Sequence, residues 1–205
     1  MMEPSGEAFW KAADFAGRFF MGQSPVHAAL EALAKLLDEE GIPYAVCGAM
    51  ALNAWGYERV TNDVDVLLTR DGLARFKQRA LGRGYVEKFA GSKGVRDTVN
   101  GVGVDVLLEG EFPGDGKPKA VSFPSPAVAV QRGALSLLPL EKLVELKLAS
   151  GLSAAHRLKD LADVLELIKA ARLPRTLADQ LDASVRAKYD ELWEAAQVVD
   201  PISES

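Results

Sequence analysis

Two segments of this sequence alternate aspartate with valine and then end in a pair of leucines. The first reads Asp63-Val64-Asp65-Val66-Leu67-Leu68, and the second reads Gly103-Val104-Asp105-Val106-Leu107-Leu108. Successive side chains of a strand point to opposite faces of a sheet. Each segment is therefore predicted to be a strand that buries its valines on one face and presents its aspartates on the other. If the two strands are neighbours, the aspartates share one cleft.

The remaining pattern predicts helices around this sheet. Apolar residues at helical spacing or helix-forming composition predict helices over 7–20, 25–40, 49–55, 72–81, 140–150, 156–171 and 177–197. Strands are expected over 44–47, 60–68, 85–89, 95–99 and 102–108, with a short edge strand at 120–123 within a loop over 110–126. We expect an α+β fold (an α/β mixed sheet flanked by helices), with N-terminal helices (1–40), a core (41–135) and a C-terminal helical region (136–205) packed as one unit with the core.

Composition narrows the function classes. The 29 acidic and 24 basic side chains give a net charge of −5, which argues against sequence-independent nucleic-acid binding as the main task. A single cysteine, Cys47, excludes an intramolecular disulfide and a zinc site built from thiolates. No apolar run reaches about 18 residues and no signal peptide is evident, so we expect a cytoplasmic protein without a membrane partner.

The paired carboxylates suggest a metal site. Asp63 and Asp65 lie on one face of their strand, where they repel each other unless a cation lies between them. Magnesium prefers oxygen ligands and usually shares them with substrate phosphates. With Asp105 added, three carboxylates can hold two Mg²⁺ ions, with Mn²⁺ as an alternative, and Asp105 is the candidate general base. Taken alone, the pair Asp63 and Asp65 is explained equally well as turn formers or solvated strand ends, and Asp105 alone is better explained as a surface residue of a half-buried strand.

A glycine at the end of the first predicted strand suggests a phosphate site. Gly48 follows Cys47 and opens a predicted helix, 15 positions before Asp63. Glycine permits close approach of the backbone, and free N–H groups at a helix start bind anions. The combination of this turn with the three aspartates favours a site over isolated surface residues.

The combination resembles a known family. Gly48-Ala49, Asp63-Val64-Asp65 and the later Asp105 are similar to the signature of the DNA polymerase beta-like nucleotidyltransferase superfamily. The segments GAMALNAWGYERVTNDVDVLL (48–68) and LEKLVELKLASGLSAAHRLKDLADVLELI (140–168) resemble small bacterial nucleotidyltransferase-like proteins that include abortive-infection toxins. The resemblance runs from about residue 44 to 168. It implies the nucleotidyltransferase fold, magnesium binding by the three aspartates, and transfer of a nucleoside monophosphate from a nucleoside triphosphate to an acceptor hydroxyl.

The resemblance also suggests nucleotide-binding residues. It implies that Lys147, together with Lys159, faces the triphosphate, whereas the residue pattern alone makes Lys147 a lysine covering the core edge and makes Lys159 a helix-start surface charge. Arg59 and Thr61, just before the acid pair, can contact phosphate or sugar or be solvated turn residues. The family's second glycine or serine is Ala49 here, which keeps a backbone N–H but has no hydroxyl.

Several interpretations of partner and role remain open. The acceptor can be RNA, a protein side chain or a small hydroxylated molecule. A non-catalytic nucleotide-binding module is the alternative that Ala49 favours. A third is the toxin of a toxin-antitoxin pair, with an antitoxin protein docked on the aromatic N-terminal helix (Phe9, Trp10, Phe15, Phe19 and Phe20). A basic helix (Arg70, Arg75, Lys77, Arg79 and Arg83) can receive RNA, although a solvated face is the simpler account.

Overall fold

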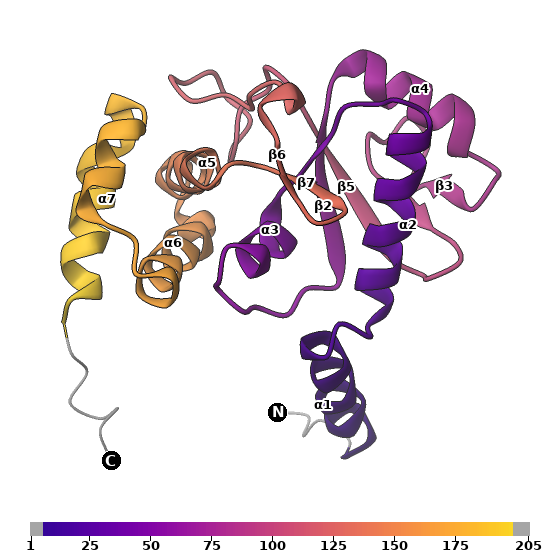
Figure 1. The fold of residues 1–205 in the computed structure, drawn as a ribbon, viewed down its shortest axis with the longest axis horizontal. Helices are drawn as coiled ribbons and strands as arrows, with labels where there is room; N and C mark the ends of the chain where they lie inside the picture. Colours follow the sequence, from indigo (N-terminus) through magenta and orange to yellow (C-terminus); the bar gives the residue numbers. More distant parts are fainter. Residues whose placement is uncertain (1–5, 199–205) are drawn as a thin grey trace.

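The computed structural model describes residues 6–198, and in that range seven strands form one mixed sheet with helices on both faces (Figure 1). The strands are β1 (Ala45–Val46), β2 (Asp63–Leu68), β3 (Tyr85–Glu87), β4 (Val95–Asp97), β5 (Gly103–Leu108), β6 (Val130–Arg132) and β7 (Leu135–Leu137). Their order is β3-β4-β5-β2-β1-β7-β6. The pairs β2–β5 and β1–β7 are parallel, and the other pairs are antiparallel. The mixed sheet flanked by helices that the sequence predicts is confirmed.

The two aspartate-valine segments are neighbouring strands at the centre of this sheet. Strands β2 and β5 run parallel along their whole length, with Val64 opposite Val104 and Asp65 opposite Asp105. Because their registers match, the valines of both strands lie on one face and the aspartates on the other. The alternating pattern therefore places Asp65 and Asp105 side by side.

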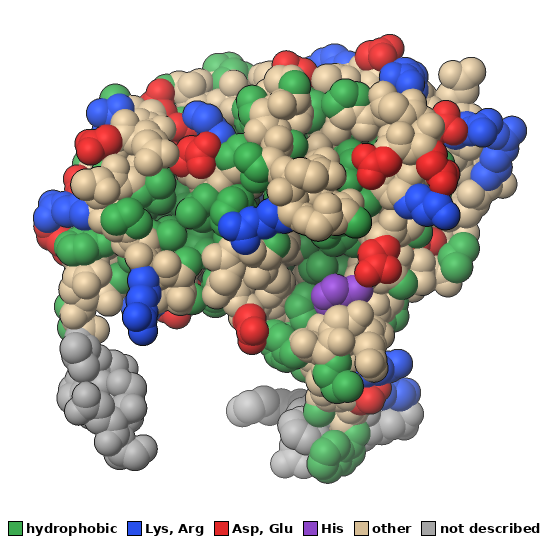
Figure 2. Space-filling view, viewed as in Figure 1, with side chains coloured by type: hydrophobic (Ala, Val, Ile, Leu, Met, Phe, Trp, Pro, Cys, Tyr) green, Lys and Arg blue, Asp and Glu red, His purple; other side chains and the backbone are tan. Residues whose placement is uncertain are grey.

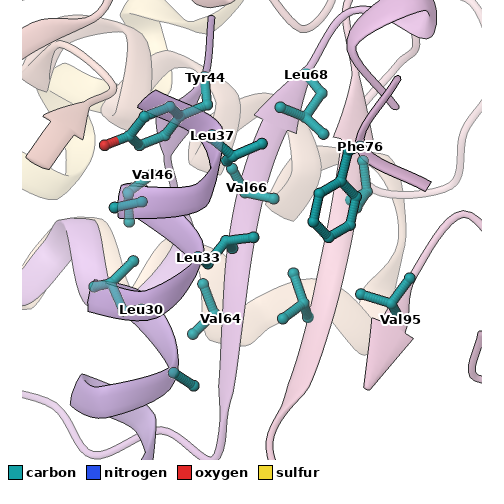
Figure 3. Packing of buried hydrophobic residues seen from close by; sticks show 14 of the residues in the cluster. Leu30, Leu33, Leu37, Tyr44, Val46, Val64, Val66, Leu68, Phe76 and Val95 are labelled. Carbon is teal, nitrogen blue, oxygen red and sulfur yellow. The ribbon is translucent and has the colours of Figure 1, made fainter. Parts of the chain in front are cut away.

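The valine face is covered by α2 (Pro25–Glu39) and α4 (Arg70–Ala80). Figure 3 shows Leu30, Leu33 and Leu37 of α2 packed toward the strand valines, with Phe76 of α4 beside them. Burial of each such side chain contributes about 1.5–3 kcal/mol. This cluster holds β2 and β5 from behind and leaves the aspartate face to the other helices.

The opposite face is covered by α3 (Gly48–Ala54) and the C-terminal helices α5 (Leu140–Ser153) and α6 (Leu158–Ala171), and α7 (Ala183–Ala196) packs against α5 and α6 on the side away from the sheet (Figure 1). Their second apolar cluster includes Leu67 of β2, Leu52 of α3 and Leu148 of α5, all fully buried. Close packing of α5 on α6 depends on Gly151, where an added Cβ would lie 2.5 Å from Leu161. The C-terminal helices thus form one wall of the space above the aspartates.

The N-terminal helix α1 (Gly6–Phe20) projects from the rest of the molecule (Figures 1 and 2). Phe19 is buried and contacts the His27 ring, with 4.8 Å between ring centroids, whereas Trp10 and Phe20 are largely exposed. The side chain of Phe9 lies outside the described residues. On the face shown in Figure 2, acidic and basic side chains are interspersed over most of the surface.

The predicted edge strand at 120–123 was wrong. That segment makes only two backbone hydrogen bonds with residues 110–111, both through Phe123, and Val121 packs into the second apolar cluster. Nearby Pro118, Pro124 and Pro126 lack the N–H groups that a strand ladder needs. The sheet is extended instead by the hairpin β6–β7, so it reaches Leu137, two residues beyond the predicted core.

Other boundaries shift by a few residues. The predicted helix over 177–197 is a 3₁₀ segment (Arg175–Gln180) followed by α7, which Asp182 caps by accepting a hydrogen bond from the Ser184 N–H. Further 3₁₀ turns lie at Pro126–Val128 and Ala155–Arg157. No helix within residues 6–198 has both the length and the apolar character needed to span a bilayer.

Candidate functional site

Asp65 and Asp105 lie at a cleft between the sheet, the C-terminal helices and the loop that follows β5. Its volume is about 790 Å³, which is within the range of small-ligand sites. The lining residues include Gly48, Asp65 and Asp105. Four basic side chains (Arg70, Lys93, Lys147 and Arg157) and two further acids (Glu111 and Asp160) also line it. The cleft thus combines carboxylates with cations, which suits a ligand that carries phosphates and a metal ion.

Asp65 is the carboxylate that the protein leaves without a hydrogen-bond partner. Among the described residues, no donor makes a hydrogen bond to its side-chain oxygens, which are open to the cleft. Burial raises the pKa of Asp65 to about 6, and the negative charges of Asp63 and Asp105 add to the rise. The positive charges of Lys147 and Lys88 act in the opposite direction. The fold therefore holds Asp65 in an environment that disfavours its ionised form unless a further cation is present.

Gly48 packs directly against this carboxylate. An added Cβ at Gly48 would lie 1.8 Å from Oδ2 of Asp65, and the residue has a φ of +58°, a left-handed conformation that glycine favours. Two independent constraints thus require glycine at the position that the sequence singled out. Gly48 opens α3, a helix of only seven residues, and the phosphate-binding role of this turn stays a prediction.

The other two acids of the predicted triad have partners. Asp105 Oδ1 accepts a hydrogen bond from Lys88 Nζ at 2.6 Å. Asp63 Oδ1 accepts one from the Thr61 hydroxyl at 2.5 Å, and Asp63 is not among the residues that line the cleft. Thr61 therefore positions Asp63 in this structure. Sequence reasoning missed Lys88, because it lies 17 positions before Asp105 in a segment without any motif.

Lys147 lies in a buried ionic network at one side of the cleft. Its ammonium contacts Asp160 at 2.8 Å and Asp163 at 2.6 Å, and the Arg59 guanidinium contacts Asp163 at 2.8 Å. Burial favours a higher pKa for Asp160, but the charge of Lys147 and the hydrogen bonds from Lys147 and Ser150 outweigh it and lower that pKa. Lys147 thus lines the cleft, whereas Arg59 is not among the lining residues, and both cations are paired with carboxylates.

Asn53 joins α3 to the segment before β2. Its side-chain amide donates to the carbonyl groups of Ala49 and Arg59 and accepts from the Arg59 N–H at 2.7 Å. This fixes the approach to Asp63 relative to the turn at Gly48. Asn53 was also missed, since an asparagine near a helix end is usually only a terminating residue.

The loop after β5 forms the outer wall of the cleft. Gly114 lies so close to α5 that an added Cβ would be 2.1 Å from the Ser153 hydroxyl, and that hydroxyl accepts a hydrogen bond from the Asp115 N–H at 3.1 Å. Lys119 holds the loop from within by contacting Asp115 at 2.6 Å. The wall is thus fastened to the C-terminal helices.

Two other predicted residues have different outcomes. Lys159 is exposed on α6 and is not among the cleft residues, so the structure does not bring it to the carboxylates. Ala49 is buried at 5% exposure beneath the turn. Cys47, next to Gly48, is inert because burial raises the pKa of its thiol.

The donor set fits a magnesium ion that is held partly by a substrate. Among the described residues, no group of three or more His, Cys, Asp or Glu side chains is arranged as a complete metal site. Magnesium is commonly bound by one or two carboxylates plus substrate phosphates, and Asp65 with Asp105 supplies such a pair. The unpartnered carboxylate of Asp65 is the observation that favours this fit.

Comparison with known proteins gives no relative. No protein-family model matches the chain, and no curated protein matches it. The residues of the site therefore have to indicate the function.

Proposed function

We propose that the protein is a magnesium-dependent nucleotidyltransferase that moves a nucleoside monophosphate from a nucleoside triphosphate to an acceptor hydroxyl. The observation that carries the proposal is the pairing of Asp65 with Asp105 in register on neighbouring parallel strands, at the edge of a cleft lined by four basic side chains. The resemblance of the sequence to nucleotidyltransferases supports the same assignment.

Each cleft residue has a role in this proposal. Asp65 and Asp105 would hold the ion, with Asp63 beside them, and a bound Mg²⁺ would supply neutralisation of phosphate charge. Lys93 and Arg70 lie at the outer rim, with Arg70 at 75% side-chain exposure, and bind the triphosphate. Asp105 takes the proton of the acceptor hydroxyl while the oxygen of that hydroxyl bonds to the α-phosphorus. The bond between the α-phosphorus and the pyrophosphate leaving group breaks in the same step.

A second candidate function is a nucleotide-binding module without turnover. Ala49 favours it, because the position lacks the hydroxyl that the related signature supplies. The pairing of Lys147 with two carboxylates favours it too, since a lysine engaged in this way is less free to contact phosphate. The acceptor, whether RNA, protein or small molecule, and an antitoxin partner remain predictions.

Calorimetric titration tests the proposal. Each nucleoside triphosphate is titrated into wild type, Asp65→Asn and Asp105→Asn protein, with magnesium and with a chelator. Asp179→Asn is the matched control, because this exposed carboxylate lies on the 3₁₀ segment before α7 and is not among the residues that line the cleft. We expect magnesium-dependent binding by wild type and the control, and a loss of at least about tenfold in the two site variants. Equal binding by all four proteins would refute the assignment, and binding without pyrophosphate release on any acceptor would favour the second candidate.

A further inference from the structure

Lys88 makes a contact that neither the sequence resemblance nor the proposed chemistry requires. Its Nζ lies 2.6 Å from Oδ1 of Asp105, the carboxylate that faces Asp65 across the two central strands. The side chain of Lys88 is 31% exposed. An ordinary surface ion pair contributes little to stability and is easily rearranged, unless the surrounding structure holds the side chain in place.

The backbone around Lys88 is fixed by the turn between β3 and β4. The Lys88 N–H donates to the Gly94 carbonyl at 3.3 Å, and Glu87 accepts a hydrogen bond from the Gly91 N–H at 2.8 Å. Lys77 of α4 fastens the turn by donating to the Glu87 carboxylate and to the Ser92 carbonyl. The start of the Lys88 side chain is therefore anchored relative to the sheet.

Two glycines leave room for the rest of the side chain. An added Cβ at Gly94 would lie 3.3 Å from Cδ of Lys88, and one at Gly103 would lie 3.3 Å from its Nζ. Both distances are shorter than ordinary van der Waals contact. The Cβ added at Gly94 would also lie 3.2 Å from Oδ1 of Asp105. Because Gly94 and Gly103 have no side chains, the Lys88 side chain has the space to extend to the Asp105 carboxylate.

The three acids of the cluster have different surroundings, and within residues 6–198 only Asp105 has a cation in direct contact. Lys88 neutralises Asp105, Thr61 donates to Asp63, and Asp65 has no donor among the described residues. A divalent ion that binds Asp105 must therefore share this carboxylate with the Lys88 ammonium or displace the ammonium, because both are cations at one carboxylate.

We propose that Lys88 is an internal cation that competes with the divalent ion for Asp105. The inference rests on the proposed function and deepens it. Lys88 keeps the acidic cluster partly neutral in the absence of a metal ion and raises the concentration of divalent ion that the site needs. Asp65 is then the carboxylate available first, and Asp105 becomes a ligand once the ion displaces the ammonium.

Manganese binding without nucleotide tests this competition. Mn²⁺ is titrated into wild type, Lys88→Met, Lys88→Gln, Lys88→Arg and Asp65→Asn protein, with free Mn²⁺ followed by electron paramagnetic resonance. Lys169→Met is the matched control, since Lys169 pairs with Glu166 on the solvent-facing side of α6 and its loss changes the net charge by the same amount. We expect Lys88→Met and Lys88→Gln to bind Mn²⁺ about fivefold more tightly than wild type or more, because one unit charge near the ion is removed. Lys88→Arg and the control should match wild type.

The outcomes separate the two proposals. Wild-type Mn²⁺ binding that depends on Asp65 but is unchanged or weakened in both neutral Lys88 variants overturns the competition and leaves the proposed function intact. Absence of Asp65-dependent Mn²⁺ binding in every variant overturns the competition, and the proposed function is then decided by the nucleotide titration, in which phosphates complete the ligands of the ion. Tighter binding by the Lys169 control of the same size as that by Lys88→Met assigns the effect to net charge and also overturns the competition.

Discussion

Replacement of Asp65 by asparagine is expected to stabilise the protein at pH 8. The folded protein holds this carboxyl where burial, followed by the charges of Asp63 and Asp105, raises its pKa from 3.8 to about 6. Ionisation of Asp65 therefore opposes folding. Asparagine has nearly the same shape and carries no charge, so the variant removes this cost.

The sign and size follow from proton linkage. Between about pH 4 and pH 6 the folded state binds more protons at Asp65 than the unfolded state does, so the stability of the wild type falls as pH rises through this window. At about 1.36 kcal/mol per pH unit, the rise from 3.8 to about 6 corresponds to about 3 kcal/mol above pH 6. Water and salt at the cleft reduce this, and we expect about 1–3 kcal/mol for the variant at pH 8.

Urea denaturation at pH 8 and pH 4 in a chelating buffer measures the difference. The variant should be more stable than wild type at pH 8 and nearly equal to it at pH 4, with similar denaturant slopes. Asp179→Asn, which removes an exposed carboxylate, controls for the change in net charge and should shift stability by less than about 0.5 kcal/mol at both pH values. A variant that is no more stable than wild type at pH 8, or is stabilised equally at both pH values, would show that ionisation of Asp65 does not lower the stability of the folded protein.

Two further substitutions test the structural supports of the cleft. Gly48→Ala should destabilise the protein by at least about 2 kcal/mol more than Gly41→Ala in urea denaturation. Both glycines have positive φ, but only Gly48 lacks space for a Cβ. Equal losses of stability would contradict the close contact between Gly48 and Asp65. Asp163→Ala should cost about 3–5 kcal/mol, because it leaves the partly buried Arg59 guanidinium without its carboxylate and leaves Lys147 paired with Asp160 alone. Glu166→Ala, from an exposed pair, should cost less than about 1 kcal/mol, and thermal unfolding that gives similar shifts for the two variants would refute the network's role.

The central strands and helices were predictable because their signals are local. The valines of β2 and β5 repeat with a period of two, and the leucines of α2 repeat with helical spacing, so face and element type can be read directly. That Asp65 and Asp105 share a cleft was predicted only on the condition that the two strands were neighbours, and their parallel register is a fact of tertiary structure that the sequence did not predict. The similarity of the two segments was the signal that made this condition reasonable.

The hairpin β6–β7 carried a signal that was overlooked. Gly133 has a φ of +59° and lies between two short segments that contain β-branched or leucine residues, a pattern typical of a hairpin. The edge strand was instead predicted at 120–123, within the proline-rich loop that precedes the hairpin. A glycine between short apolar runs was the better indicator, since proline removes ladder donors.

The partners of the charged residues could not be predicted from the sequence. Arg59 and Asp163 are separated by 104 positions, and Lys88 and Asp105 by 17, so no local spacing indicates either pair. Lys147 was proposed as a phosphate ligand through resemblance, whereas in the structure two carboxylates hold it. Ion pairs depend on which surfaces the fold brings together, and local patterns do not contain that information.

The interpretation of the aspartates as ordinary strand-end residues accounts for only part of the geometry. It suits Asp63, which accepts a hydrogen bond from Thr61 in the turn before β2 and lies outside the cleft residues. It does not suit Asp65, which burial and like charge both penalise and which packs against a glycine in a left-handed conformation. An asparagine at this position would satisfy the fold at lower free energy, since like charges on paired strands destabilise a sheet. The cost that the fold accepts at Asp65 is explained if a cation and its phosphate ligand offset it during function.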